Sequence, residues 1–273
     1  MNIWNELKKE VGYVDVTNQY IELAKRYYEQ DCIEKDLQIS ARQVGLNISQ
    51  LPESYEVRIS KGYIVNIHSC IERFLLAFKD LPGSPTKKKE YKPEKDKNRL
   101  QWTLKHCYGS IDGDVGELYN VCNYYRLVRN KIVHGGSEDT ELRVAYNNVI
   151  HISEGLLLSR MCCKLEAPKR INELGFDDQV LFSRSVLKLC ERIYKDSQYN
   201  WLKVIESNRE TIKRIISRDR SCERRSTNKI IKFLKQMYPI KEADIQELID
   251  IIQQIEWQKT IRVSSLVVKH PPS

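Results

Sequence analysis

Apolar side chains at helical spacing constrain the fold of this chain more than any other feature. Between Tyr63 and Leu81 they recur three or four residues apart, at Ile64, Ile67, Ile71, Phe74, Leu75 and Phe78. This spacing places them along one face of a helix. The run Pro82-Gly83-Ser84-Pro85 cannot continue that helix. The pattern therefore predicts a long helix that is buried along one side and followed by a turn.

Further amphipathic segments are expected to be helical, so the chain is predicted to be all-α. A polar, lysine-rich loop follows the turn, and helices are predicted at 100–108, 115–134 and 140–165. We divide the chain into an N-terminal helical extension at 1–60, a four-helix core at 61–168 and a C-terminal helical region at 169–273. The sequence does not decide whether the last region is a separate domain.

Composition is typical of a soluble intracellular protein. The 273 residues are 41% hydrophobic and 30% charged, which allows one large or two modest cores. We expect neither a signal peptide nor a membrane span, and a cytoplasmic location. The eight cysteines are scattered and are expected to be reduced. No metal-ligand spacing and no glycine-rich phosphate loop is present, so we predict no metal and no cofactor.

The segment 129–136 reads Arg-Asn-Lys-Ile-Val-His-Gly-Gly and ends the predicted helix 115–134. Arg129 occupies the next position on the apolar stripe of that helix. An inward arginine requires a carboxylate, a subunit boundary or a phosphate as its partner. Asn130 and His134 are four residues apart and share a face, and the two glycines allow the helix to stop at His134. The three polar side chains are therefore expected to converge on one cleft.

This motif resembles the Arg-x4-6-His signature of the HEPN superfamily, whose members include ribonucleases of toxin–antitoxin and anti-phage defence systems. The resemblance covers about residues 62–165, and the motif is placed at the end of the third of four predicted helices, as in that family. It implies a four-helix up-and-down bundle, here with additional N- and C-terminal helices. It also implies a metal-independent endoribonuclease with Arg129, Asn130 and His134 as catalytic residues.

The chemistry of these side chains agrees with RNA cleavage by 2′-hydroxyl attack. Such cleavage needs a base, an acid and positive charge on the phosphorane. His134 can serve as base or acid near neutral pH, and Arg129 suits phosphate oxygens. One histidine cannot hold both protonation states at once. The resemblance also implies a homodimer with two facing motifs, and such a dimer supplies a second histidine.

Several alternatives remain open at the level of sequence. Arg129 could pair with Glu72 or Glu117, and the glycines could be only a helix cap, which would make the chain a non-catalytic helical RNA-binding or adaptor module. Glu72 could instead be an auxiliary group that faces the cleft. HEPN toxins that are silenced by tyrosine AMPylation commonly carry a tyrosine where this chain has Gly136. A different antitoxin or regulatory protein is therefore expected.

The formal charge of +8 is concentrated in two stretches. The loop 87–99 mixes both signs and is interpreted as a solvated surface. The second stretch favours binding to a phosphate backbone. Its predicted RNA-binding residues are Arg214, Arg218, Arg220, Arg224, Arg225 and Lys229. The expected partner is tRNA, rRNA or mRNA, and the sequence does not distinguish among them.

Overall fold

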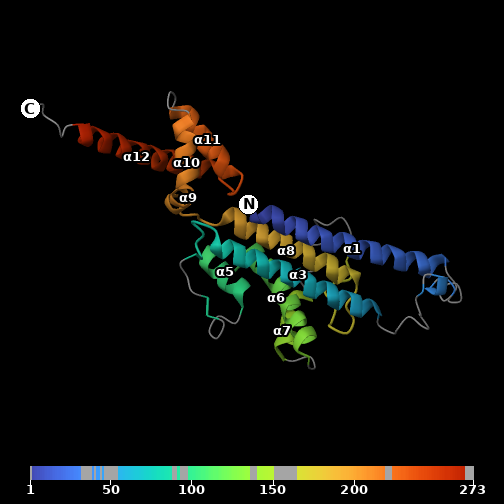
Figure 1. The fold of residues 1–273 in the computed structure, drawn as a ribbon. Coiled ribbons are helices and arrows are strands. Elements are labelled where there is room, and N and C mark those ends of the chain that lie inside the picture. The colour runs from blue at the N-terminus through green and yellow to red at the C-terminus, as the bar shows by residue number, and fades with distance from the viewer. Residues whose placement is uncertain are drawn as a thin grey trace, which may run out of the picture.

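The computed structural model describes residues 2–31, 39, 41–43, 45, 55–87, 91–92, 98–135, 140–150, 165–218 and 223–267, with helix positions 28–31, 223 and 255–267 described as backbone only. Within these ranges the ordered elements are helices joined by turns and loops (Figure 1). The prediction of an all-α chain is confirmed for this part. The described helices include none that is long and apolar enough to cross a membrane.

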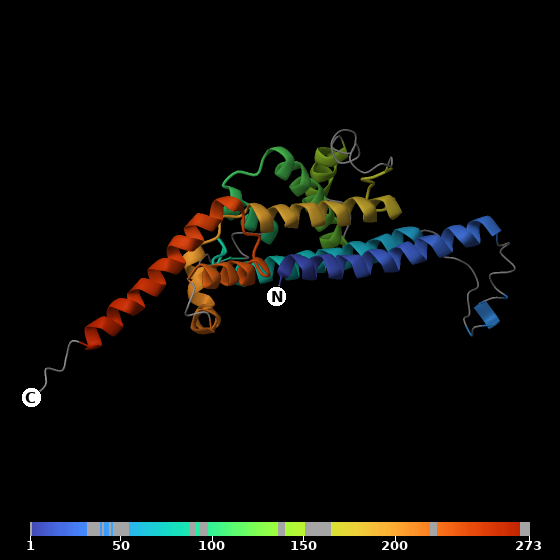
Figure 2. The same cartoon turned by 90° about the horizontal axis from the view of Figure 1, so that it is seen from above.

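Four long helices form the core of the molecule. They are α1 (Ile3–Asp31), α3 (Tyr55–Asp80), α6 (Gly113–His134) and α8 (Phe176–Asp196). Both α1 and α6 pack against α3 and α8, and Figure 2 shows α1 running beside α3. The predicted stripe of α3 is buried, with Ile64, Ile67 and Phe78 fully inaccessible to solvent. On α8, Phe182, Val186 and Ile193 are equally buried and complete the same hydrophobic core.

This core takes helices from all three of the regions predicted from sequence. Of the helices predicted to complete the bundle, α5 (Arg99–Tyr108) is less than half as long as α3, and α7 is described over Thr140–Ile150. At about 1.5 Å per residue α5 cannot cover the length of α3 or α6. The structure instead places α1 and α8 along those helices. Positions 151–164 of the predicted fourth helix lie outside the described residues.

The turn after α3 joins the core to the C-terminal helices. Gly83 has φ +76°, and a Cβ atom there would lie 2.6 Å from Val204 Cγ2 and 2.7 Å from the carbonyl oxygen of Asn200. The Asn200 amide donates to the Gly83 carbonyl at 2.9 Å. Glycine is therefore required both by the backbone angle and by the close approach of the next segment. This contact fixes the start of α9 (Trp201–Ser207) against the end of α3.

The C-terminal helices pack on one another beyond α9. They are α10 (Arg209–Arg218), α11 (Glu223–Lys235) and α12 (Glu242–Val267). Tyr194 of α8 donates a hydrogen bond to the Met237 carbonyl at 2.6 Å, and the Tyr199 ring contacts Trp201 in a tilted arrangement and Tyr238 edge to face. These contacts hold the group of helices at the end of α8, from which α12 extends away (Figure 2).

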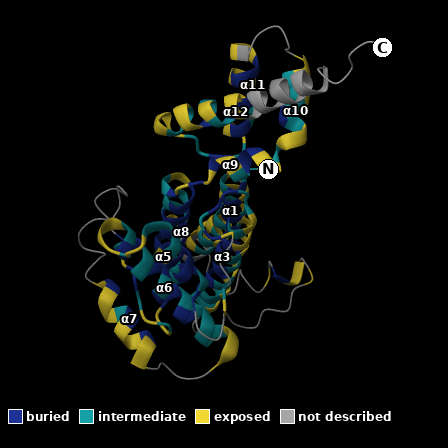
Figure 3. Cartoon of the chain, turned by 90° about the vertical axis from the view of Figure 1, so that its left-hand side faces the viewer, coloured by how far each residue is buried: buried dark blue, intermediate teal, exposed yellow. Residues whose placement is uncertain are grey.

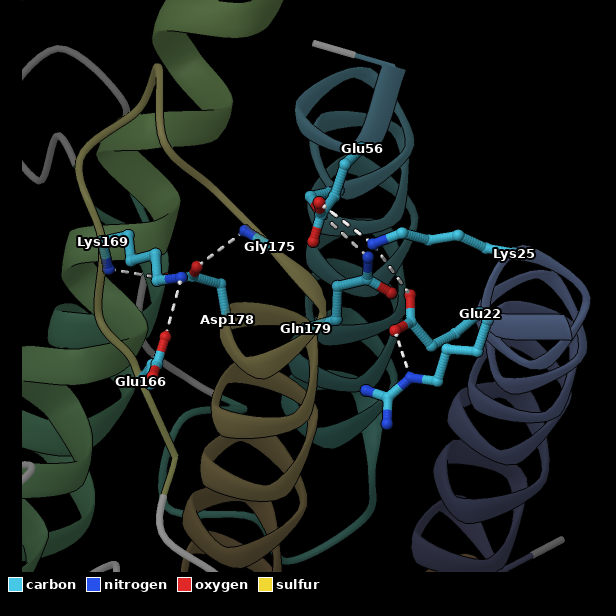
Figure 4. Close-up of polar contacts among 10 residues, drawn as sticks. Glu22, Lys25, Glu56, Glu166, Lys169, Gly175, Asp178 and Gln179 are labelled. Atoms are coloured by element: carbon cyan, nitrogen blue, oxygen red, sulfur yellow. Dashed lines mark hydrogen bonds and ion pairs between the residues drawn. The ribbon is translucent and has the colours of Figure 1, made fainter. Parts of the chain in front are cut away.

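Asp178, in the first turn of α8, is the main polar anchor between α8 and α6. Its carboxylate accepts hydrogen bonds from the amides of Lys169 and Gly175, each at 2.9 Å, and from the Tyr125 hydroxyl at 2.8 Å. Figure 4 shows the carboxylate between the loop and the start of α8. Burial raises the pKa of Asp178 to about 6, while the three donors favour its charged form. The loop before α8 is thereby tied to the helix that bears the motif.

The cysteines that the structure describes agree with a reduced protein. Cys70, Cys107, Cys122 and Cys190 are free thiols. Burial raises the pKa of Cys122 and of Cys190, so neither thiol is a reactive thiolate at neutral pH. Their role is in packing, as predicted. The other four cysteines lie outside the described residues.

Candidate functional site

The motif lies at the C-terminal end of α6, where the helix is held by its apolar face. Leu118, Val121, Cys122, Tyr125 and Val128 are all buried against α3 and α8. The helix ends at His134, because Gly135 adopts φ +74° and its amide donates to the Lys131 carbonyl at 2.9 Å. A residue with a side chain is strained at that angle. The predicted glycine stop is therefore confirmed at Gly135, whereas Gly136 is outside the described residues.

Arg129 is partly buried and its guanidinium is incompletely satisfied. Its Nη1 atom donates to Asn130 Oδ1 at 3.4 Å, which is a long hydrogen bond. Its Nε atom is buried and has no hydrogen-bond partner. Within the described part of the chain, no carboxylate forms an ion pair with Arg129. A buried donor on a permanently charged group is costly unless something accepts from it. The arrangement is therefore suited to an anion from outside the chain.

Glu72 has a different partner from the one considered in the sequence. Arg99 at the start of α5 donates from Nη1 to Glu72 Oε2 at 2.9 Å, and both side chains are about a quarter to a third exposed. This ion pair ties α5 to α3. Glu72 is therefore not the acid that neutralises Arg129. The other acid that we considered, Glu117, makes no ion pair with Arg129 within the described ranges.

Asn130 and His134 continue from Arg129 along the last turn of α6. Asn130 is partly buried and contacts Arg129 as described, whereas His134 is exposed at the helix end. Hydrogen bonds among the described residues do not link His134 to Arg129 or Asn130. The structure thus brings Arg129 and Asn130 together and leaves the imidazole of His134 open to solvent. An exposed imidazole at this position is accessible to a substrate or to a second protein chain.

Two residues beside the motif were not predicted as part of the site. His68 of α3 is buried, and its pKa is lowered to about 4 by burial and by the positive charges of Arg129 and Arg126. It is therefore neutral at pH 7. Arg126 precedes Asn130 by four residues and so lies on its face of α6, a spacing that could have been read from the sequence. The proximity of His68 depends on the packing of α3 against α6 and has no sequence signal.

A row of hydrogen bonds holds Arg126 in place. Asn98 donates from Nδ2 to Asn123 Oδ1 at 3.0 Å and to the Tyr119 hydroxyl at 3.3 Å. Arg126 Nε donates to the same Asn123 oxygen at 3.0 Å, and burial lowers the pKa of Arg126. Arginine nevertheless keeps its charge at any physiological pH. Two cationic side chains, Arg126 and Arg129, are thus positioned on the same end of α6.

The predicted RNA-binding residues form a separate basic surface on α10 and α11. Arg214 and Arg218 are exposed on α10, and Arg220 is outside the described residues. A hollow of about 360 Å³ on α11 is lined by Arg224, Arg225, Asn228, Lys229 and Lys232. Figures 1 and 3 place α10 and α11 at one end of the molecule and α7, which follows the motif, at the other. We call the residues that line this hollow the basic hollow.

Comparisons of the chain with models of known protein families, with curated proteins and with solved structures found no match. Within the described ranges, no group of three or more His, Cys, Asp or Glu side chains is placed to hold a metal ion. The assignment of a function therefore depends on the side chains of the motif and their surroundings.

Proposed function

We propose that this chain is a metal-independent endoribonuclease of the HEPN type, with Arg129, Asn130 and His134 as its catalytic residues. The observation that carries the proposal is the state of Arg129. Its buried Nε lacks an acceptor, and within the described residues no carboxylate neutralises its charge. Phosphate oxygens provide the negative charge that this guanidinium lacks. The alternative of a structural ion pair is disfavoured because Glu72 is bound to Arg99.

The proposed reaction is an internal transfer at one phosphodiester. A base removes the proton of the ribose 2′-hydroxyl, the 2′-oxygen forms a bond to phosphorus, and the bond from phosphorus to the 5′-oxygen breaks. An acid gives a proton to the departing 5′-oxygen. Arg129 stabilises the negative charge of the phosphorane, and Asn130 positions the guanidinium through their hydrogen bond. The products carry a 2′,3′-cyclic phosphate and a 5′-hydroxyl.

The base and the acid are assigned to the His134 side chains of two chains in a homodimer. One imidazole cannot be neutral and protonated in the same step. The exposure of His134 at the end of α6 supports this arrangement, because a second chain can approach it without displacing the core. His68 is less suited to this role, since it is buried and stays neutral until about pH 4.

The RNA products test the proposal directly. Purified protein is incubated with a defined RNA in excess EDTA, and the ends of the fragments are analysed by mass spectrometry. We expect cleavage to continue without divalent metal and to leave 2′,3′-cyclic phosphate and 5′-hydroxyl ends. Fragments with 5′-phosphate ends, or cleavage that stops in EDTA and returns with a divalent metal, would be incompatible with this mechanism.

The basic hollow is proposed to hold the RNA backbone away from the point of cleavage. A variant with both Arg224→Glu and Arg225→Glu is expected to bind single-stranded RNA more weakly. The slope of log affinity against log salt concentration should be less steep by roughly 1 to 2. Each phosphate contact contributes about 0.7 to that slope. Fluorescence anisotropy over a salt series measures both effects. Lys105→Glu, an exposed charge reversal on α5, is the control. Equal affinities for the double variant and the control would refute this role.

A further inference from the structure

The α1 helix reverses the direction of its apolar face after its first three turns. Near its start, the side chains that face α3 and α8 are apolar: Ile3, Leu7 and Val11 are all buried. Further along, the positions on that side are polar, with Asp15, Asn18, Glu22 and Lys25 following at helical spacing. The Glu22 and Lys25 side chains are only 13% and 16% exposed. Helices normally turn their polar face to water. In this half of α1 the polar face is instead directed toward the core, and the apolar face is directed toward water.

Specific polar contacts hold α1 in this orientation. The Tyr63 hydroxyl of α3 donates a hydrogen bond to Asp15 Oδ1. Lys25 Nζ lies 3.1 Å from Glu56 Oε2 at the start of α3, and Figure 4 shows both side chains between the two helices. These partners would be lost if α1 rotated about its axis, and buried polar groups without partners are costly. The outward direction of the opposite face is therefore fixed by the fold.

That outward face carries large apolar side chains in a regular order. Tyr13 is 65% exposed, Val16 50%, Tyr20 70%, Leu23 64% and Tyr27 60%. We call these five residues the outer stripe. Their spacing alternates between three and four residues, which is the seam spacing of helices that pair along their length. Ile21, beside the stripe, is also 41% exposed.

The outer stripe is about as large as the largest apolar patch that a typical monomer exposes, roughly 300–600 Å². A tyrosine contributes roughly 150–250 Å² when fully buried, so the exposed fractions of the three tyrosines amount to about 300–500 Å². The aliphatic side chains add to this area. Patches of this size are often functional, and stable interfaces bury about 800 Å² on each partner. The stripe therefore supplies much of the apolar area that a protein interface buries.

We infer that the outer stripe binds the outer stripe of a second copy of this chain, with the two α1 helices antiparallel and Tyr20 at the two-fold axis. In residue type the stripe reads Tyr, aliphatic, Tyr, aliphatic, Tyr in both directions about Tyr20, with Val16 four residues before it and Leu23 three residues after it. In a two-fold interface residue i meets j while j meets i. Tyr13 then meets the partner's Tyr27, and Val16 lies opposite the partner's Ala24, next to the partner's Leu23.

The charges along α1 agree with this pairing. Four of the residues that flank the stripe, Gly12, Thr17, Gln19 and Ala24, carry no charge, and the flanking Arg26 is paired with Glu22 at 2.7 Å. Lys9 lies four residues before Tyr13, and Arg26 lies immediately before Tyr27. Parallel helices would place each of these cations beside its own copy, which is unfavourable, whereas antiparallel helices separate them. The antiparallel arrangement is therefore favoured.

This contact is distinct from the dimer proposed for catalysis. α1 and α6 each pack on α3 and α8, and they lie on opposite sides of that pair. Pairing through α1 therefore leaves the end of α6 free. Two different two-fold contacts on opposite sides of one chain produce assemblies larger than a dimer. The α1 contact does not depend on whether the chain cleaves RNA.

The mass of the full chain in solution tests the contact. Sedimentation velocity is measured for the wild type, for Tyr20→Glu and for Leu202→Glu, a control at an exposed apolar position on α9. We expect Tyr20→Glu to reduce the mass of the assembly at least twofold at micromolar concentration and Leu202→Glu to leave it unchanged. Circular dichroism verifies that both variants keep their helices. A wild-type monomer, or equal masses for the wild type and Tyr20→Glu, overturns the proposal.

Cysteine cross-linking tests the antiparallel geometry separately. At the two-fold axis an introduced thiol meets its own copy within disulfide range. Tyr20→Cys is therefore expected to form a linked dimer under mild oxidation that the wild type does not form. Tyr13→Cys should link only when mixed with Tyr27→Cys. Efficient linking of Tyr13→Cys to itself would demonstrate parallel helices, and no linking in any variant would exclude the contact.

Discussion

His134→Ala is expected to reduce the rate of RNA cleavage about 100- to 10,000-fold, the range for loss of a general acid or base. Because His134 is exposed at the end of α6, the substitution should leave the free energy of unfolding nearly unchanged. Single-turnover cleavage of a labelled RNA measures the rate, and thermal unfolding tests the fold. The loss of activity would then be attributable to the imidazole alone.

A matched histidine and a conservative arginine change refine the same experiment. His106→Ala alters a histidine of α5 whose Nδ1 lies 2.8 Å from the Trp102 carbonyl, and cleavage should be unaffected. Arg129→Lys keeps a positive charge but removes the planar donors, so it should retain little activity. If His134→Ala cleaves RNA as fast as His106→Ala, the assignment of His134 is wrong and the helical adaptor becomes the better description.

Asp178→Ala is expected to lower the free energy of unfolding by about 3–5 kcal/mol, because a lost acceptor costs about 1–3 kcal/mol for each buried donor left unsatisfied. Three donors depend on Asp178: the amides of Lys169 and Gly175 and the hydroxyl of Tyr125. The residue is itself completely buried. Urea denaturation followed by circular dichroism measures the change.

The neighbouring residue provides a control for this prediction. Asp177 also accepts one backbone hydrogen bond, from the Glu166 amide at 2.7 Å, but that contact is exposed to solvent. Asp177→Ala should therefore cost about 1 kcal/mol or less, as is typical of a surface cap. Equal losses for the two variants would show that Asp178 does not anchor α8 to α6 in the way the structure indicates.

The sequence predicted which segments are helices far better than how those helices pack. The apolar spacing of α3 and the glycine after α6 are local signals, and both are confirmed. The partner of a helix is set by contacts between residues distant in the chain. Thus α8 was predicted as a helix of the C-terminal region, although it forms one wall of the core. α1 was predicted only as part of an N-terminal helical extension, and that prediction does not reveal that Tyr20 faces outward.

The candidate site shows the same division between local and distant signals. Arg129 and Asn130 are adjacent in the chain, and their contact follows from that. The sequence left open whether Glu72 pairs with Arg129, because Arg99 competes for Glu72 through the packing of α5 on α3. His68 lies far from the motif in the chain, and its closeness to Arg126 and Arg129 is a property of the folded core alone.

The position of α8 in the chain also sets when the motif acquires its surroundings during synthesis. The core around α6 requires α8, which is complete only at Asp196, well after His134 has been made. At about 5–20 residues per second, the ribosome needs roughly 3 to 12 seconds to add the intervening residues. Until then Tyr125 has no Asp178 to bind, and α6 lacks one of the two helices against which it packs. A nascent chain therefore carries the motif before it can hold that motif in place.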